Sequence, residues 1–187
     1  MKGDYDRYKV FTLPNLFSVL RIFLIPIFVI VFFSSYKNHS IIAALILIFS
    51  GITDILDGYI ARKYNLITDL GKLLDPFADK LTQATVCICL VIQNIAPYWL
   101  LIIFVVKELL MIVGGARIVK KGKVISSSKW FGKVATVVFF LVMTSIILFD
   151  LKGDIVVILI LISLAFMIFS FFMYLPIFLR MFSEKNV

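Results

Sequence analysis

The sequence contains very few residues that could form a thiolate, disulfide or imidazole site. It has two cysteines and one histidine among 187 residues. Cys87 and Cys89 are two positions apart in an apolar stretch, so on a helix they point in different directions. They fit neither a disulfide nor a zinc pair, and we expect them to serve ordinary packing. His39 falls in a short polar connection, and we assign it no role.

Charged residues are also scarce, which excludes an ordinary soluble domain. Only 16% of the chain is charged, 62% is hydrophobic, and the mean hydropathy is +1.08. Several apolar runs reach the roughly 20 residues that are needed to cross a bilayer. We therefore predict an all-α integral membrane protein, with no room for a separate soluble domain. The acidic residues Asp4 and Asp6 near the start argue against a cleavable signal peptide.

The apolar runs predict six transmembrane helices joined by short connections. We expect a membrane-surface segment over residues 1–15, a six-helix domain over residues 16–180 and a cytoplasmic tail over residues 181–187. The predicted spans are residues 16–36, 41–61, 70–92, 98–119, 130–149 and 155–178.

The distribution of basic residues predicts the orientation in the membrane. Fourteen lysines and arginines fall on the side of both termini, whereas only Lys37 and Lys152 fall on the other. By the positive-inside rule both termini are cytoplasmic, and the chain lies in the cell membrane. A basic rim at the cytoplasmic face either reflects this topology signal or attracts an anionic substrate or lipid. It consists of Arg117, Lys120, Lys121, Lys123, Lys129 and Lys133. The sequence lacks the interleaved aromatic and basic residues of nucleic-acid-binding proteins, so we expect no nucleic acid partner.

Four aspartates interrupt the second and third predicted spans. Asp54 and Asp57 are three positions apart and Asp75 and Asp79 are four apart, so each pair shares one helix face. An acid inside the hydrocarbon is costly unless it pairs, binds a cation or faces a polar cavity. The two pairs flank one cytoplasmic connection, so we expect them to meet at similar depth on adjacent antiparallel helices. We interpret this cluster as the functional centre.

The residue types around the aspartates favour hard metal ions and phosphate chemistry. Converging carboxylates repel one another unless cations neutralise them, and oxygen ligands without histidine or cysteine select Mg²⁺ or Mn²⁺. Two such ions about 4 Å apart suit phosphoryl transfer. Gly58 and Gly71 allow either a ligand or a neighbouring helix to approach closely. Arg62 follows Asp57 by about one turn and suits a phosphate, or it marks a helix end.

This spacing resembles the signature of the CDP-alcohol phosphotransferase family. All eight defining positions are present in the pattern Asp54-x2-Asp57-Gly58-x2-Ala61-Arg62-x8-Gly71-x3-Asp75-x3-Asp79. The resemblance implies six spans and a homodimer. It also implies transfer of a substituted phosphate from a CDP-linked donor, commonly CDP-diacylglycerol, to an alcohol, with release of CMP.

The resemblance also implies the roles of individual residues. The four aspartates would bind two divalent ions, Mg²⁺ or Mn²⁺, and Asp79 would also act as general base on the acceptor hydroxyl. The implied CDP-site residues are Gly58, Ala61, Arg62 and Gly71. The physical chemistry agrees, because metals can stabilise the leaving CMP while a carboxylate deprotonates the alcohol.

Other segments bear on the acceptor alcohol. Thr12-Leu13-Pro14-Asn15-Leu16 followed by Arg21 is similar to the opening of bacterial phosphatidylglycerophosphate synthases, so Asn15 and Arg21 are additional candidate site residues. Leu74-Asp75-Pro76-Phe77-Ala78-Asp79-Lys80 shows the same similarity. The implied acceptor is glycerol 3-phosphate. Arg117 and Lys133 would bind its phosphate, or else they follow the positive-inside rule.

Three points leave alternatives open. Ala135 stands where those enzymes carry the second lysine of a Gly-Lys-x-Lys-Thr motif, so a cardiolipin synthase with phosphatidylglycerol as acceptor is also consistent. Lys107 and Glu108 either neutralise charge within the bundle or take part in catalysis. A divalent-cation transporter is a third hypothesis, which Arg62 and the basic rim disfavour because they would repel a cation at the entrance.

Overall fold

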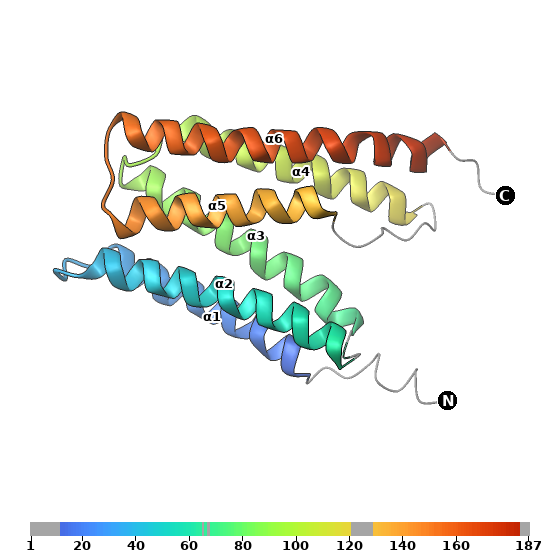
Figure 1. The fold of residues 1–187 in the computed structure, drawn as a ribbon, viewed down its shortest axis with the longest axis horizontal. Coiled ribbons are helices and arrows are strands. Elements are labelled where there is room, and N and C mark those ends of the chain that lie inside the picture. Colours follow the sequence, from blue (N-terminus) through green and yellow to red (C-terminus); the bar gives the residue numbers. More distant parts are fainter. Residues whose placement is uncertain (1–11, 65, 67, 121–128, 184–187) are drawn as a thin grey trace. The chain divides into compact units, whose positions relative to one another are not determined.

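A computed structural model describes residues 12–64, 66, 68–120 and 129–183, and all the regular structure in these residues is α-helical (Figure 1). The helices are α1 (Leu13–Phe32), α2 (His39–Lys63), α3 (Asp69–Ile92), α4 (Tyr98–Lys120), α5 (Trp130–Leu148) and α6 (Asp154–Ser183). The predicted all-α class is confirmed. The boundaries differ most at α1, which ends four residues before the predicted end, and at α6, which continues past residue 178. Most of the predicted surface segment, residues 1–11, lies outside the described residues.

Five of the helices are long and apolar enough to cross a membrane. These are α1, α2, α4, α5 and α6. The remaining helix, α3, has 24 residues, but its first half contains five charged positions, Asp69, Lys72, Asp75, Asp79 and Lys80. The predicted membrane-spanning character is thus supported for five helices, and α3 differs from them through its charged half.

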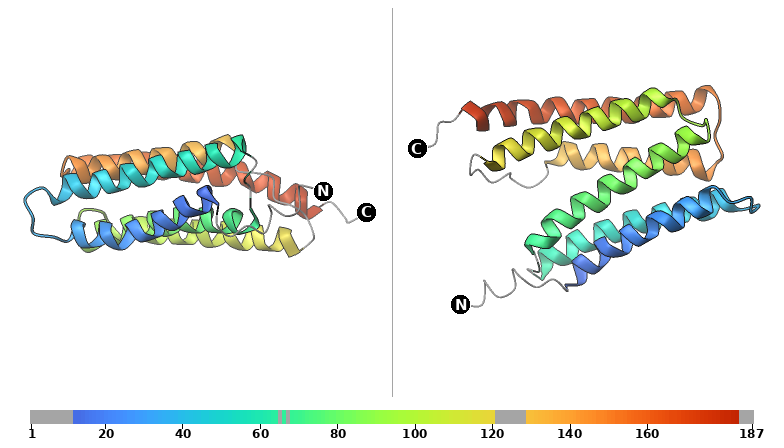
Figure 2. Two further views of the ribbon diagram at one scale, coloured as in Figure 1. Left: turned by 90° about the horizontal axis from the view of Figure 1, so that it is seen from below. Right: turned by 180° about the vertical axis from the view of Figure 1, so that it is seen from behind.

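The chain divides into two compact units. The first comprises residues 1–89 and 144–151, and the second comprises residues 90–143 and 152–187. In the first unit, α1 and α2 are joined by a short connection and pack side by side (Figure 2). In the second unit, α4 packs against α6, and the rings of Phe104 on α4 and Phe139 on α5 lie 6.1 Å apart.

Small and aromatic side chains fill the core of the first unit. Ala43 and Ala44 of α2 are completely buried, and such small residues let two helices approach closely. Phe28 and Phe32 of α1 are buried and stacked, with ring centroids 5.5 Å apart. On α3, both cysteines are buried free thiols, in agreement with the predicted packing role.

Two threonines fix the starts of α1 and α3, the helices that carry several candidate site residues. The Thr12 hydroxyl accepts a hydrogen bond from the backbone N–H of Asn15 at 3.4 Å. The Thr68 hydroxyl accepts one from the N–H of Gly71 at 3.0 Å. Both are N-cap contacts, which satisfy N–H groups that have no partner within the helix. Pro14 lies in the first turn of α1, where its missing N–H removes no helical hydrogen bond.

Candidate functional site

The four aspartates lie on two helices of the first unit. Asp54 and Asp57 are in the last three turns of α2, and Asp75 and Asp79 are in the first three turns of α3. Asp57 is 2% exposed, whereas the side chain of Asp54 is 44% exposed. Asp75 and Asp79 are half-buried. Asp57 is therefore the acid whose charge most needs compensation from within the protein.

Arg21 of α1 provides that compensation. Its side chain is 2% exposed. One terminal nitrogen, Nη2, donates a hydrogen bond to Oδ2 of Asp57 at 2.6 Å, and the other, Nη1, donates to Oδ1 of Asp54. Hydrogen bonds between ionised groups are stronger than neutral ones, and the planar guanidinium can serve two acceptors at once. Arg21, predicted as an additional site residue, thus contacts two of the four aspartates directly.

A second contact from α1 reaches the carboxylates of α3. The Ser18 hydroxyl donates a hydrogen bond to Oδ1 of Asp75. It also lies 3.2 Å from the carbonyl oxygen of Pro14, but its single proton can serve only one acceptor at a time. Because Arg21 binds the α2 pair and Ser18 binds Asp75, α1 links the two helices that carry the acids.

Asp79, the predicted general base, is held by its own helix. Nε2 of Gln83, one turn later, lies 3.0 Å and 3.1 Å from the two carboxylate oxygens of Asp79. Nζ of Lys80 lies 3.5 Å from Oδ2 of Asp79 and 3.4 Å from Oε1 of Gln83. Gln83 is 2% exposed, so packing restricts its side chain and its amide orients the carboxylate of Asp79.

Sequence reasoning missed Ser18 and Gln83, although both leave a signal in the sequence. Asn15, Ser18 and Arg21 recur every three residues in an otherwise apolar helix, which places them on neighbouring positions of one face. Gln83 follows Asp79 by four residues, the spacing at which two side chains on a helix can interact.

The four aspartates offer the oxygen ligands that a divalent ion needs. Two of them, Asp54 and Asp57, are paired with Arg21. Across residues 12–64, 66, 68–120 and 129–183, no three histidine, cysteine or acidic side chains lie close enough to share one metal ion. Instead, Arg21 pairs with Asp54 and Asp57 and offsets one of their two negative charges. Carboxylates on two helices, with the hydroxyl of Ser18 beside Asp75, are nonetheless the hard oxygen ligands that Mg²⁺ and Mn²⁺ prefer. The two-ion site stays a prediction.

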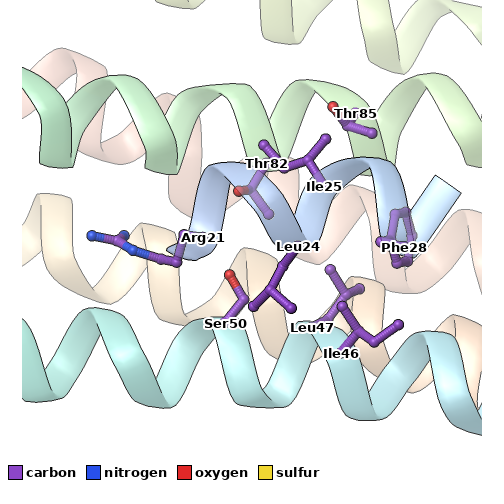
Figure 3. A pocket seen from close by; sticks show the side chains of 9 residues that line it. All are labelled: Arg21, Leu24, Ile25, Phe28, Ile46, Leu47, Ser50, Thr82 and Thr85. Atoms are coloured by element: carbon purple, nitrogen blue, oxygen red, sulfur yellow. The ribbon is translucent and has the colours of Figure 1, made fainter. Parts of the chain in front are cut away.

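A small cavity lies beside Arg21, bordered by α1, α2 and α3 (Figure 3). Its volume is about 10 Å³, enough for about one water molecule. Apolar residues form much of its lining, namely Leu24, Ile25, Phe28, Ile46 and Leu47. Figure 3 shows the guanidinium of Arg21 extending away from these side chains. An unpaired charge would be costly among them, so the guanidinium is best placed at the carboxylates.

The residues predicted to bind CDP lie close to the acids along the chain. Gly58 and Ala61 are half-buried on α2, within about one turn of Asp57. The side chain of Arg62 lies outside the described part of the structure. Gly71 is buried in the first turn of α3. Their role in nucleotide binding stays a prediction.

Gly71 has a packing role that the structure makes visible. A Cβ atom at this position would lie 2.6 Å from Oδ1 of Asn15 and 3.0 Å from Oγ1 of Thr68. The Thr68 hydroxyl donates to Oδ1 of Asn15 at 3.0 Å while it accepts from the N–H of Gly71. This buried relay joins the start of α3 to the first turn of α1. Gly71 is therefore needed for close packing, whether or not it also contacts a nucleotide.

Replacing Gly71 by alanine is expected to lower the free energy of unfolding by about 1–2 kcal/mol, because the added methyl group disrupts the buried relay. Gly51→Ala on α2 is the matched control, since a Cβ at Gly51 meets nothing within 4 Å. That substitution should be neutral or stabilising by up to about 1 kcal/mol. Thermal unfolding in detergent measures both. Equal melting temperatures for the two variants would contradict the packing role.

Arg117 and Lys133, predicted to bind the acceptor phosphate, belong to the second unit. Arg117 is exposed near the end of α4, and Lys133 is exposed in the first turn of α5. Exposed cations near helix ends are consistent with both interpretations given above, a topology signal or an anion site. Their role therefore stays a prediction.

Tyr174 of α6 secures the start of α5. Its hydroxyl accepts a hydrogen bond from the backbone N–H of Lys129 at 3.0 Å, and its ring packs edge-on against Phe131 at 4.7 Å. A Cβ at Gly132 would lie 2.8 Å from this hydroxyl. Ala135, one turn further, is 6% exposed. A lysine at position 135 would have to place its charge in this packed surrounding, so alanine fits the site.

Lys107 and Glu108 form an ion pair on α4. Nζ of Lys107 lies 2.5 Å from Oε1 of Glu108, and both side chains are largely buried. This agrees with the interpretation that the two residues neutralise charge within the bundle.

Comparison with known proteins matches most of the chain to a protein family. The sequence profile described as CDP-alcohol phosphatidyltransferase matches residues 11–175. This range includes all six helices except the end of α6, and it contains every aspartate of the candidate site.

Individual relatives differ in the reaction that their names indicate. A CDP-diacylglycerol–glycerol-3-phosphate 3-phosphatidyltransferase of Bacillus subtilis is 34% identical over 160 residues, which cover 79% of this chain and 82% of the relative. A putative cardiolipin synthase of Mycobacterium tuberculosis is 35% identical over 148 residues, 79% of this chain and 70% of the relative. A protein of Rickettsia bellii with the same name as the Bacillus protein is 46% identical over 78 residues, 42% of this chain and 43% of the relative.

Proposed function

Because the chain belongs to the CDP-alcohol phosphatidyltransferase family, we propose that it transfers a phosphatidyl group from CDP-diacylglycerol to glycerol 3-phosphate. The products are CMP and phosphatidylglycerophosphate, an intermediate of phospholipid biosynthesis. Membership in a family of enzymes argues against the cation-transporter hypothesis.

The observation that carries this proposal is the set of four aspartates on α2 and α3, connected through Arg21 and Ser18 of α1. Each acid occupies its position in the family's pattern, and each has a specific polar contact. A structural membrane protein gains nothing from four such acids, since intramembrane carboxylates are costly to bury.

We propose that Asp54, Asp57, Asp75 and Asp79 hold two divalent ions, Mg²⁺ or Mn²⁺. When bound, these ions polarise the pyrophosphate of the donor and stabilise the negative charge on the departing CMP. Gly58, Ala61, Arg62 and Gly71 line the CDP site in this proposal. The guanidinium of Arg62 suits a phosphate oxygen of the nucleotide.

Asp79 is the general base in this mechanism. Its carboxylate takes the proton of the attacking hydroxyl, and the amide of Gln83 keeps both oxygens oriented through contacts of 3.0 Å and 3.1 Å. The acceptor phosphate binds at Arg117 and Lys133. The acyl chains of the donor stay in the bilayer while its headgroup reaches the polar site, which accounts for a transferase built from membrane helices.

The proposal includes an arrangement in the membrane. All six helices span the cytoplasmic membrane, both termini lie in the cytoplasm, and the site opens to the cytoplasmic side. Residues 16–180 form the catalytic domain, with a surface segment before it and a short tail after it. Two copies associate as a homodimer.

The acceptor has a second candidate. A cardiolipin synthase would use phosphatidylglycerol instead of glycerol 3-phosphate. The buried Ala135, in place of a lysine, and the 35% identity to the mycobacterial protein favour this alternative. The preference for glycerol 3-phosphate rests on the relative named for that acceptor and on the two exposed cations, which suit a small phosphate.

An acceptor screen tests the reaction. Purified protein with CDP-diacylglycerol and Mg²⁺ or Mn²⁺ is expected to release CMP when glycerol 3-phosphate is added. Mass spectrometry of the lipid fraction should then show phosphatidylglycerophosphate. Chelation of the metal should abolish the product, and Asp79→Asn serves as the inactive control.

Two outcomes of the screen would change the proposal. Cardiolipin formed from phosphatidylglycerol, with no product from glycerol 3-phosphate, would assign the second candidate. No CMP release with any alcohol, with either metal, would contradict the proposed reaction.

A further inference from the structure

The guanidinium of Arg21 occupies the same carboxylates that are proposed to hold metal. Nη2 binds Oδ2 of Asp57 at 2.6 Å, and Nη1 binds Oδ1 of Asp54. Arg21 thus bridges two acids that are one helical turn apart, and it does so from another helix. A divalent ion between these acids would use the same negative charge.

Burial makes this pairing strong. Arg21 and Asp57 are each about 2% exposed, so neither charge is well solvated by water. Among the described residues, Nε of Arg21 is buried without a hydrogen-bond partner. The hydrogen bonds of its guanidinium are therefore those to Asp54 and Asp57. Separating the pair would leave two buried charges uncompensated.

The cavity beside Arg21 offers its guanidinium no alternative position with comparable polar contacts. The cavity beside Arg21 has a volume of about 10 Å³ and a largely apolar lining that includes Leu24, Phe28 and Leu47 (Figure 3). A charged group moved there would be desolvated without a counter-charge. Arg21 therefore keeps its contact with the acids until another cation replaces it.

We propose that Arg21 is a positioning residue that holds Asp54 and Asp57 in place and competes with divalent cations for them. This inference rests on the metal ligands assigned in the proposed function. A divalent ion bound at these acids lies close to the guanidinium and weakens its two ion pairs, because two cations at one carboxylate pair repel each other. Arg21 thereby weakens metal binding and offsets one of the two negative charges before the metal arrives.

The test is the affinity of the purified full chain for Mn²⁺ without any substrate, measured by the electron paramagnetic resonance of free Mn²⁺. Arg21→Met removes the competing charge and is expected to tighten Mn²⁺ binding at least tenfold. Lys63→Met is the matched control. It removes one positive charge from α2, where Lys63 contacts the rings of Tyr59 and Tyr64 and no aspartate of the site, so the affinity should change less than twofold.

Arg21→Lys keeps the test valid if Arg21→Met does not fold. A lysine retains the charge but has a single ammonium group in place of the planar fork, so it competes less well for two acids. We expect Mn²⁺ to bind more tightly to this variant than to the natural protein. Mn²⁺ should also raise the melting temperature of this variant by more than it raises that of the natural protein.

Equal or weaker Mn²⁺ binding in the folded Arg21 variants would overturn the inference and leave Arg21 with a purely structural role. Mn²⁺ binding to none of the proteins would overturn it as well. Because the measurement uses no lipid or nucleotide, its result is independent of CMP release. A failed transferase assay with the expected Mn²⁺ shifts would therefore reject only the proposed reaction.

Discussion

Asp79→Asn is expected to lower the rate of CMP release by about 10²–10⁴-fold, the contribution typical of a general base, while CDP-diacylglycerol still binds. The amide has nearly the same shape as the carboxylate, but it cannot accept the proton of the acceptor hydroxyl. Gln83 fixes this side chain at 3.0 Å and 3.1 Å, so the substitution changes its chemistry more than its position. Turnover under saturating substrates measures the first effect, and equilibrium binding of the donor measures the second.

Two further variants serve as comparisons for Asp79→Asn. Gln83→Leu removes the contacts that orient Asp79 and should lower turnover by about tenfold, as expected for a misplaced base. Asp150→Asn makes the same chemical change at an exposed connection between α5 and α6, where no effect on turnover is expected. If Asp79→Asn retained more than a tenth of the natural rate, another group would have to be the base.

Asp57→Ala is expected to lower the free energy of unfolding of the metal-free protein by about 3–5 kcal/mol, the usual cost of removing one partner from a buried ion pair. The substitution leaves the buried Arg21 with only Asp54, whose side chain is 44% exposed. Asp54→Ala should cost at most about 1 kcal/mol, because water partly solvates Asp54 and the buried pair of Arg21 with Asp57 remains. Thermal unfolding in detergent with a chelator compares the two variants.

A double substitution distinguishes the energetic contribution of the ion pair from the cost of leaving one buried charge unpaired. Arg21→Met with Asp57→Leu removes both buried charges, and apolar replacements of a buried pair are often neutral or stabilising. We therefore expect the double variant to be more stable than Asp57→Ala alone. If Asp54→Ala and Asp57→Ala were equally destabilising, the unequal burial of the two acids would have no energetic consequence.

The apolar runs predicted the helices well because each run ends at strongly polar or turn-forming residues. The predicted starts of α4 and α5, at residues 98 and 130, agree with the structure. The predicted end of the first span, residue 36, was wrong by four residues, because α1 ends at Phe32. The apolar pattern continues past Phe32, but the Ser34 hydroxyl accepts a hydrogen bond from the N–H of Tyr36 at 3.1 Å. Such local contacts compete with the helix, and a hydropathy pattern does not register them.

The candidate site was predictable in its residues but not in its connections. Spacing placed the aspartates on common faces of α2 and α3, because helical geometry is local. The partner of each acid depends on which helices pack together, and no local pattern specifies that. The sequence identified Arg21 through a resemblance alone, and only the structure assigns it to Asp54 and Asp57. Likewise, Ala135 appeared as a departure from a motif until its burial supplied a packing reason.

The pairing of Arg21 with acids of the following helix has a consequence for membrane insertion. Arg21 lies about 12 Å along α1 from Leu13, at about 1.5 Å per residue. An arginine within a membrane helix costs up to about 2.5–3.5 kcal/mol when the helix inserts alone. Its counter-charges are synthesised more than thirty residues later, on α2. Insertion of α1 and α2 together as a helical hairpin reduces that cost, because Arg21 then enters the lipid together with its counter-charges.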